Sequence, residues 1–199
     1  LFRSAEIALP QQVKRSGEPT PDYSGAVEYY TRAADQNHVS AQYNLGNLYY
    51  WGNGVTQDYT QALNWYTHAA DQGHANAQNN IGNMYYWARG VVQDYAEALT
   101  WYQRAADQNH QQAQYNVGIM YQLGQGVTQD YTQALTWYTR AADQGHAHAQ
   151  NNLAHLYYWG HGVTQDYAQA FTRYLEAAGQ DRKSTRLNSS HLVISYAVF

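Results

Sequence analysis

The sequence contains no cysteine, and its three prolines, Pro10, Pro19 and Pro21, all lie in the first 21 residues. The absence of cysteine excludes disulfide bonds, thiolate metal ligands and cysteine nucleophiles. Because proline interrupts helices, its absence after position 21 leaves the rest of this 199-residue chain free to be helical. The chain is long enough for one ordinary domain or one short array of repeats.

Long apolar runs are also missing, although 44% of the residues are apolar. No run approaches the roughly 18 residues that a membrane-spanning helix needs. The chain starts LFRSAEIALP, which has neither an initiator methionine nor a basic segment before an apolar stretch. We therefore expect no membrane span and expect residues 1–20 to be a poorly ordered remnant of a longer N-terminal region. The sequence does not indicate a cellular compartment.

Positive charge is scarce in the central part of the chain. Residues 17–180 contain no lysine, and five arginines stand against thirteen acidic residues, which gives a net charge of −8. Proteins that bind nucleic acids need a basic face to displace the counterions of the phosphate backbone. This charge balance therefore argues against a DNA or RNA partner.

A repeat occupies most of the chain. The segment GVTQDYTQALNWYTHAADQGHANAQ begins at Gly54 and returns with few changes at Gly90 and Gly126. Five aspartates lie 36 residues apart in the same register, namely Asp22, Asp58, Asp94, Asp130 and Asp166. This period predicts an array over residues 21–180, made of four full units and the first helix of a fifth.

Each unit contains two helical patterns. In residues 58–72, Asp58 is placed to cap a helix, and apolar residues then recur at helical spacing. The second pattern covers residues 41–51 and ends at the two-glycine turn WGNG. A unit this short cannot bury its own apolar face, so each unit must stack on the next. The sequence therefore predicts an all-α solenoid.

The repeated residues form the motif A-x-x-x-L-G-x-x-Y followed by G-x-G-V-x-Q-D-Y-x-x-A-x-x-W-Y-x-x-A-A-x-Q-G over residues 22–180. With this motif the chain resembles the Sel1-like repeat family, a relative of the tetratricopeptide repeats. The resemblance implies a right-handed α-solenoid that acts as an adaptor in assembling protein complexes. Two residues depart from the motif: Ala154 replaces the helix glycine in the fourth unit, and Arg173 replaces the tryptophan of the WY pair near the end of the array.

The repeat pattern stops after Gln180. The segment DRKSTRLNSSH that follows corresponds to the translation of a common sequencing-library adapter, and the final ISYAVF corresponds to its continuation. Our hypothesis is that residues 181–199 are a translated assembly artefact and are disordered. The alternative is a disordered natural tail. Resequencing the locus without that library preparation tests the hypothesis, which fails if the same codons return.

Histidine and aspartate are the residue types that could suggest chemistry. His38, His74, His110 and His146 lie 36 residues apart, so they fill one repeated structural position and cannot converge on one metal ion. The repeated aspartates fit helix caps. No unit contains a carboxylate pair, a Ser/His/Asp set or a phosphate-binding glycine loop. We therefore expect a protein that is not an enzyme, with no metal, no cofactor and no small-molecule substrate.

The face of the second helix opposite its apolar stripe is the expected binding surface. At 100° per residue, the tyrosine, tryptophan and asparagine positions of this helix lie roughly on that face. By the resemblance to tetratricopeptide repeats, this helix lines the concave side of the solenoid. The expected partner-binding residues are Tyr43, Asn47, Tyr50, Trp51, Asn79, Asn83, Tyr86, Trp87, Tyr115, Asn151, His155, Tyr158 and Trp159.

Two further expectations concern these residues. Burying an unpaired amide costs free energy, which favours exposure of Asn47 and Asn83. Replacing Tyr50 and Tyr86 with alanine should then weaken partner binding and leave stability nearly intact. For the tryptophans the alternative is that they pack against the turn or the neighbouring unit.

Tyrosine, tryptophan and asparagine are typical of recognition surfaces, because aromatic rings give contact area at low entropic cost and amides adapt their hydrogen bonds. We therefore predict a non-catalytic scaffold or adaptor that binds a protein or peptide segment on its concave face. The alternative is a regulatory or targeting module of a longer bacterial secreted or signalling protein.

Overall fold

The computed structural model describes residues 23–187, and this part of the chain contains nine α-helices and no strand. The helices are α1 (Ser24–Ala34), α2 (Val39–Trp51), α3 (Tyr59–Asp71), α4 (Ala75–Tyr86), α5 (Tyr95–Asp107), α6 (Gln111–Leu123), α7 (Tyr131–Asp143), α8 (Ala147–Trp159) and α9 (Tyr167–Leu187). Four helix pairs are thus followed by one more helix. The predicted all-α repeat fold, with its 36-residue period, is confirmed.

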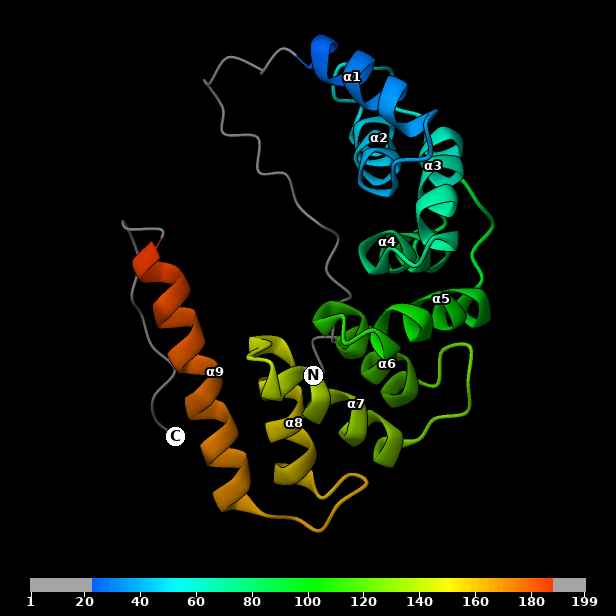
Figure 1. Ribbon diagram of the computed structural model, residues 1–199. Helices are drawn as coiled ribbons and strands as arrows, with labels where there is room; N and C mark the ends of the chain where they lie inside the picture. Colours follow the sequence, from blue (N-terminus) through cyan, green and yellow to red (C-terminus); the bar gives the residue numbers. More distant parts are fainter. Residues whose placement is uncertain (1–22, 188–199) are drawn as a thin grey trace.

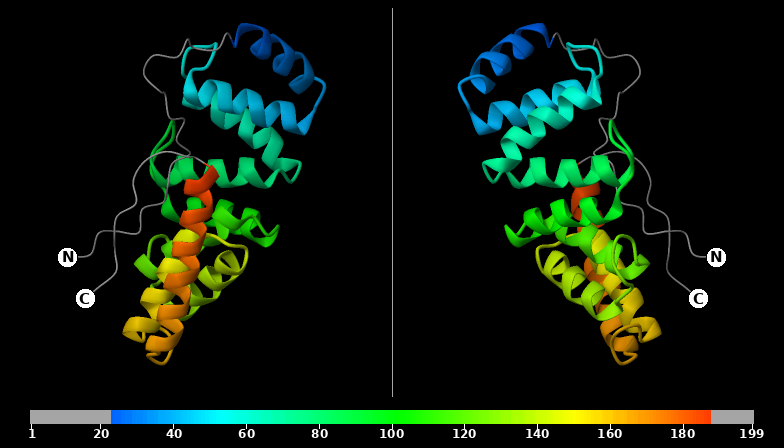
Figure 2. Two further views of the ribbon diagram at one scale, coloured as in Figure 1. Left: turned by 90° about the vertical axis from the view of Figure 1, so that its left-hand side faces the viewer. Right: turned by 90° about the vertical axis from the view of Figure 1, so that its right-hand side faces the viewer.

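The helices form a curved band (Figure 1). The odd-numbered helices lie on the outside of the curve, and the even-numbered helices α2, α4, α6 and α8 lie on its inner side. The two side views show the successive pairs stacked along the band (Figure 2). Each even-numbered helix packs most extensively against the odd-numbered helix that follows it, so that pair is the tightest structural unit.

Aspartates start the outer helices, as the repeat predicted. One carboxylate oxygen of Asp58 accepts hydrogen bonds from the backbone N–H groups of Thr60 (2.9 Å) and Gln61 (3.0 Å). Asp94, Asp130 and Asp166 cap α5, α7 and α9 in the same way. These bonds satisfy N–H groups that a helix leaves without a partner in its first turn. The expected cap at Asp22 lies outside the described residues.

The turns after the inner helices need a left-handed backbone. Gly52, Gly124 and Gly160 have φ values of 67–69° at the ends of α2, α6 and α8. Ala88 occupies the equivalent position after α4 and also has a positive φ, 54°. A left-handed conformation costs a residue with a Cβ atom about 1 kcal/mol, so the turn geometry overrides the local preference of Ala88.

Glycines inside three inner helices allow the outer helices to approach closely. A Cβ atom built on Gly46, Gly82 or Gly118 would lie 2.6 Å from the ring of Tyr66, Tyr102 or Tyr138, respectively. All three tyrosine rings are almost completely buried. The absence of a side chain at each glycine is therefore what makes room for the largest core residue of the next helix.

Helix α9 continues to Leu187, seven residues past the expected end of the array at residue 180. The hypothesis that residues 181–199 are a translated artefact and are disordered stays a prediction. Residues 1–22 and 188–199, on which the other terminal expectations fall, lie outside the described residues. None of the helices in residues 23–187 combines the length and the apolar character needed to cross a membrane.

Candidate protein-binding face

Five of the predicted binding residues are in the core. Tyr50 and Tyr86 are 6% and 7% exposed, Tyr115 is 4% exposed, and Asn79 and Asn83 are equally enclosed. The predicted exposure of Asn83 is therefore wrong. The expectation that Tyr50 and Tyr86 can be replaced without loss of stability conflicts with this burial.

Contacts with the next unit explain the burial of Tyr86. Its hydroxyl group donates a hydrogen bond to Gln125 in the turn after α6 (2.8 Å). Its ring packs against the rings of Trp87 and Tyr95, with centroids 4.9 Å and 5.1 Å away. Burial raises the pKa of Tyr86, so the hydroxyl group remains a donor. Tyr86 thus joins two units together.

Asparagines of the inner helices serve as internal acceptors. The hydroxyl groups of Tyr66 and Tyr102 donate to the side-chain oxygens of Asn47 (2.7 Å) and Asn83 (2.8 Å). Asn79 accepts a hydrogen bond from Asn116 (3.1 Å). The argument for exposure assumed an unpaired amide, but these amides are paired inside the protein, so their burial carries no such penalty.

The third unit keeps the same hydrogen bond with different residues. Ile119 stands where Asn47 and Asn83 stand in the earlier units, and it cannot accept a hydrogen bond. Gln122, one helical turn further along α6, accepts from the Tyr138 hydroxyl group instead (2.6 Å). Burial raises the pKa of Tyr138 well above its usual value of 10, so the hydroxyl group keeps its proton. A buried hydroxyl group needs an acceptor for that proton, and Gln122 provides it.

The accessible residues of the inner helices form a stripe that is rotated from the predicted face. It follows the helical spacing i, i+4, i+7 and i+11, and we call it the inner stripe. Its residues are Ser40, Asn44, Asn47 and Trp51 in α2, Asn76, Asn80, Asn83 and Trp87 across α4 and its end, Gln112, Asn116, Ile119 and Leu123 in α6, and His148, Asn152, His155 and Trp159 in α8. Asn83, Asn116 and Ile119 are buried, and the others are partly or fully accessible.

Several predicted residues belong to this accessible surface. Asn47, Trp51, Trp87 and Asn151 are half-buried, as is Tyr43, whose ring stacks on His74. His155, Tyr158 and Trp159 are exposed, and Trp159 has 60% of its surface accessible. The ring of Trp51 meets that of Tyr50 edge to face at 4.9 Å. The half-buried tryptophans therefore pack on their own unit with part of the ring and present the rest to solvent.

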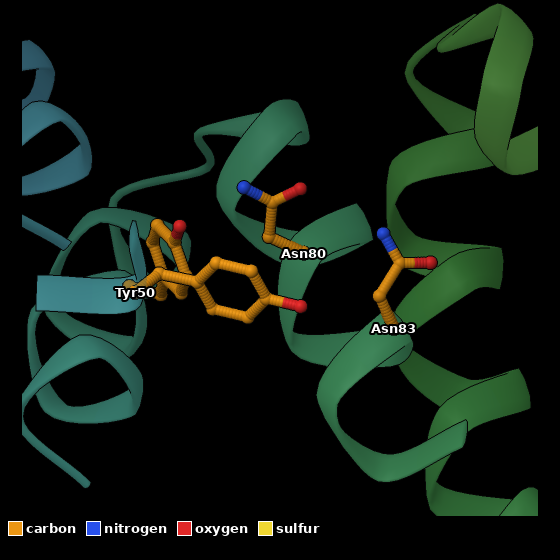
Figure 3. Close-up of a pocket in the computed structure, with 4 residues that line it drawn as sticks. Tyr50, Asn80 and Asn83 are labelled. Carbon is orange, nitrogen blue, oxygen red and sulfur yellow. The ribbon is translucent and has the colours of Figure 1, made fainter. Parts of the chain in front are cut away.

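The positions Asn44, Asn80, Asn116 and Asn152 were missed by the sequence argument. The signal was present, because this position holds asparagine in all four units. Asn80 lines a small cleft together with Tyr50, Tyr66 and Asn83, and this cleft has room for about one water molecule. Figure 3 shows the Tyr50 hydroxyl group pointing toward the space between Asn80 and Asn83. Such a cleft is far smaller than the roughly 300 Å³ at which ligand pockets usually begin.

A second amide row connects the units inside the core. Gln78 in α4 is buried and donates to the backbone oxygen of Ala70 in α3 (3.0 Å). Its own side-chain oxygen accepts from Gln108, which directly follows α5 (2.7 Å). The same pair of bonds occurs around Gln42 and Gln114. Because the amides of Gln42, Gln78 and Gln114 have partners at both ends, the row holds neighbouring helices in register. Gln150, at the same position of α8, donates to Ala142, but its buried oxygen has no partner within the described residues.

Three of the four repeated histidines cap inner helices with their side chains, whereas His38 makes no such bond at the start of α2. The Nδ1 atoms of His74, His110 and His146 each accept from a backbone N–H group three residues further on, at 3.1–3.2 Å. The Nε2 atom of His110 donates to Asn76 (2.7 Å), which fixes a neutral ring. Burial lowers the pKa of all three, and the pKa of His146 falls to about 4 through burial and the nearby His148. In residues 23–187 no three histidine or acidic side chains are grouped to hold a metal ion.

The fold and this surface define an α-helical repeat solenoid with an accessible inner face. The model of the Sel1 repeat matches residues 15–38, 39–74, 75–110, 111–146 and 147–181. The chain therefore belongs to the Sel1 repeat family. Proteins of this family are generally non-catalytic scaffolds that mediate protein interactions.

Two solved structures with Sel1 repeats are similar to this chain. One is c5321, a protective antigen of uropathogenic Escherichia coli strains, with 38% identity and a TM-score of 0.78 over 80% of this chain and 34% of c5321. The other is a Sel1 repeat protein of Oxalobacter formigenes, with 34% identity and a TM-score of 0.77 over 80% of this chain and 65% of that protein. The chain thus spans about a third and just under two thirds of their lengths.

A curated relative matches a single unit. The uncharacterised protein NMB1327 of Neisseria meningitidis serogroup B is 50% identical over 36 residues, which are 18% of this chain and 8% of the relative. The length of this match equals one repeat period.

Proposed function

We propose that this chain is a non-catalytic scaffold that holds a protein or peptide segment against its inner, even-numbered helices. The observation that carries the proposal is the inner stripe, whose accessible members combine tryptophan rings with side-chain amides. Trp159 is 60% exposed, and Trp51 and Trp87 are half-exposed on the same side of their helices. Aromatic rings with neighbouring amides have the composition of a recognition surface.

The shape of the surface supports a macromolecular partner. The small cleft around Asn80 has too little volume for a typical small-molecule ligand. The inner helices instead offer an extended concave area, which is the usual binding surface of a solenoid (Figure 1). A protein segment can use such an area because it makes many contacts along the whole band.

A second proposal is that the chain is a regulatory or targeting module within a longer bacterial protein. The observation that favours it is length, since the chain spans only 34% of c5321 and 65% of the Oxalobacter formigenes protein. In that case the inner face would still bind a segment, and the rest of the protein would determine what the binding controls.

Selection of short random peptides displayed on phage, with the full chain as bait, tests the first proposal. We expect enriched peptides to lose binding to the Trp159→Ala variant, whose side chain is exposed and whose loss should leave the helices intact. The matched control is Tyr29→Ala, because Tyr29 is an exposed aromatic residue on outer helix α1. The proposal fails if no peptide is enriched, or if the two variants bind enriched peptides equally well.

A further inference from the structure

The inner helices carry no formal charge. None of α2, α4, α6 and α8 contains an aspartate, glutamate, lysine or arginine. The histidines of these four helices are His148 and His155, both in α8. A face of four helices without a charged residue is unusual, since charged residues are enriched on most protein surfaces.

The charges lie elsewhere in the structure. Acidic residues cap the outer helices from the position just before the first residue, as Asp94 does, and end them at the last residue, as Asp107 does. The arginines lie on the outer helices and in the turns, where Arg104 and Arg140 cover the rings of Trp101 and Trp137 at 4.4 Å and 4.5 Å. Carboxylates therefore border the inner face at the helix ends, while the face itself is neutral.

The chemistry of the inner stripe changes from the start to the end of each inner helix. The last stripe residue of every inner helix is apolar, and these residues form a row of Trp51, Trp87, Leu123 and Trp159. Asparagine, glutamine, serine and histidine occupy the positions closer to the start of each helix, except for the buried Ile119 in α6. Two half-buried amides on the inner helices, Asn44 and Asn151, have no hydrogen bond within the described part of the chain. These amides can donate to and accept from a partner.

We infer that the partner segment is itself uncharged, with apolar side chains against the row of tryptophans and neutral polar groups or main-chain amides against the asparagines. A charged side chain pressed against this face would lose water and would find no counter-ion. A neutral segment pays no such cost, and backbone N–H and C=O groups match amides in both directions. This inference rests on the proposed function and specifies its ligand chemistry.

The same displayed peptides, resynthesised free of the phage, test this inference. We expect them to carry no net charge and to contain apolar residues. Their dissociation constants should change less than about threefold between about 0.01 M and about 1 M salt, over which the Debye length falls from about 30 Å to about 3 Å. Charged peptides held by the acidic borders would instead weaken more than about tenfold over this range.

One substitution probes the neutrality of the face without disturbing the fold. Asn47→Asp keeps an oxygen acceptor for the Tyr66 hydroxyl group but adds a negative charge to the inner stripe. We expect it to weaken neutral peptides at least about fivefold, because the carboxylate must lose water when the peptide binds. Asn64→Asp makes the same change at an exposed position of outer helix α3 and should have no effect.

The outcomes separate the two proposals. If enriched peptides lose binding to Trp159→Ala but are charged and salt-sensitive, the scaffold function stands and the neutral partner is wrong. If they are insensitive to both Trp159→Ala and Asn47→Asp, they do not bind the inner stripe, and both proposals fail. Circular dichroism melting of each variant verifies that a lost interaction is not lost folding.

Discussion

The unit formed by α4 and α5 and the unit formed by α8 and α9 share one repeat pattern but differ in burial. Tyr86 is 7% exposed, whereas its counterpart Tyr158 is 40% exposed. On the outer helices, Leu99 is 7% exposed and its counterpart Phe171 is 64% exposed. The difference comes from the next unit: α5 packs extensively against both α4 and α6, whereas α9 packs extensively only against α8 and reaches α7 through the Arg173–Asp143 ion pair (3.7 Å).

The comparison shows that a repeat residue has no fixed role. Tyr86 is a core residue because Gln125 of the following unit bonds to its hydroxyl group. Tyr158 makes similar ring contacts within its own unit, at 4.8 Å from Trp159 and 5.2 Å from Tyr167, but remains accessible. In a solenoid each unit supplies half of an interface, so burial depends on the neighbour as much as on the residue.

The strongest test of this comparison is the pair Tyr86→Ala and Tyr158→Ala. Removing the buried Tyr86 ring leaves a cavity and strands Gln125, so we expect the free energy of unfolding to fall by about 3 to 5 kcal/mol. Removing the accessible Tyr158 ring should cost less than about 1 kcal/mol. Urea denaturation followed by circular dichroism measures both changes.

Each substitution removes the same atoms from the same repeat position, so each is the control for the other. Equal losses of stability in the two variants would show that burial by the next unit does not determine the role of this position. A small loss for Tyr86→Ala alone would also contradict the assignment of Tyr86 to the core.

Much of the fold could be predicted from the sequence, because a period of 36 residues reveals the units without any knowledge of their packing. The cap at Asp58 and the glycine turn after the second helix of the unit followed from residue type and position alone. Each is a local requirement, namely an acceptor at a helix start or a left-handed residue at a helix end. Such requirements can be recognised in one unit and verified in the next.

The orientation of the inner helices could not be predicted in the same way. Counting 100° per residue places Asn83 opposite the apolar stripe, but it says nothing about contacts with the preceding and following units. Those contacts widen the buried arc, so Asn83 pairs with Tyr102 in the interior. The repeated Asn80 position was a better indicator of the accessible side. The histidine caps were missed because histidine is not among the usual capping residues.

Acid should lower the free energy of unfolding through His146, which lies at the start of α8. His146 caps α8 through Nδ1, its ring stacks on Tyr115, and its pKa is lowered to about 4 from an ordinary 6.5. The unfolded chain binds this proton more readily, so the stability is complete above about pH 6.5 and is lost as the pH falls toward about 4. This difference corresponds to roughly 3 kcal/mol.

Thermal melting between pH 7 and about pH 5.5 measures this effect above the usual range of carboxylate titration. The variant His146→Asn keeps an oxygen acceptor at the cap and removes the titrating ring, so its stability should depend less on pH. If His146→Asn loses stability on acidification as steeply as the original chain, the cap at α8 is not the group responsible. His110, whose pKa is also lowered by burial, would then be the next group to replace.

The smallest expected effect is that replacing glycine with alanine stabilises the protein at one position and destabilises it at another. Changing an exposed helix glycine to alanine normally stabilises a protein by up to about 1 kcal/mol. Gly179→Ala in α9 should follow this rule, since a Cβ atom there meets nothing within 4 Å. Gly82→Ala should instead cost about 1 to 2 kcal/mol, because its Cβ atom would lie 2.6 Å from the enclosed ring of Tyr102. Urea denaturation of the two variants decides the matter. Stabilisation by Gly82→Ala would mean that the interior units can separate as freely as the last helix, and the contrast between the two regions would be lost.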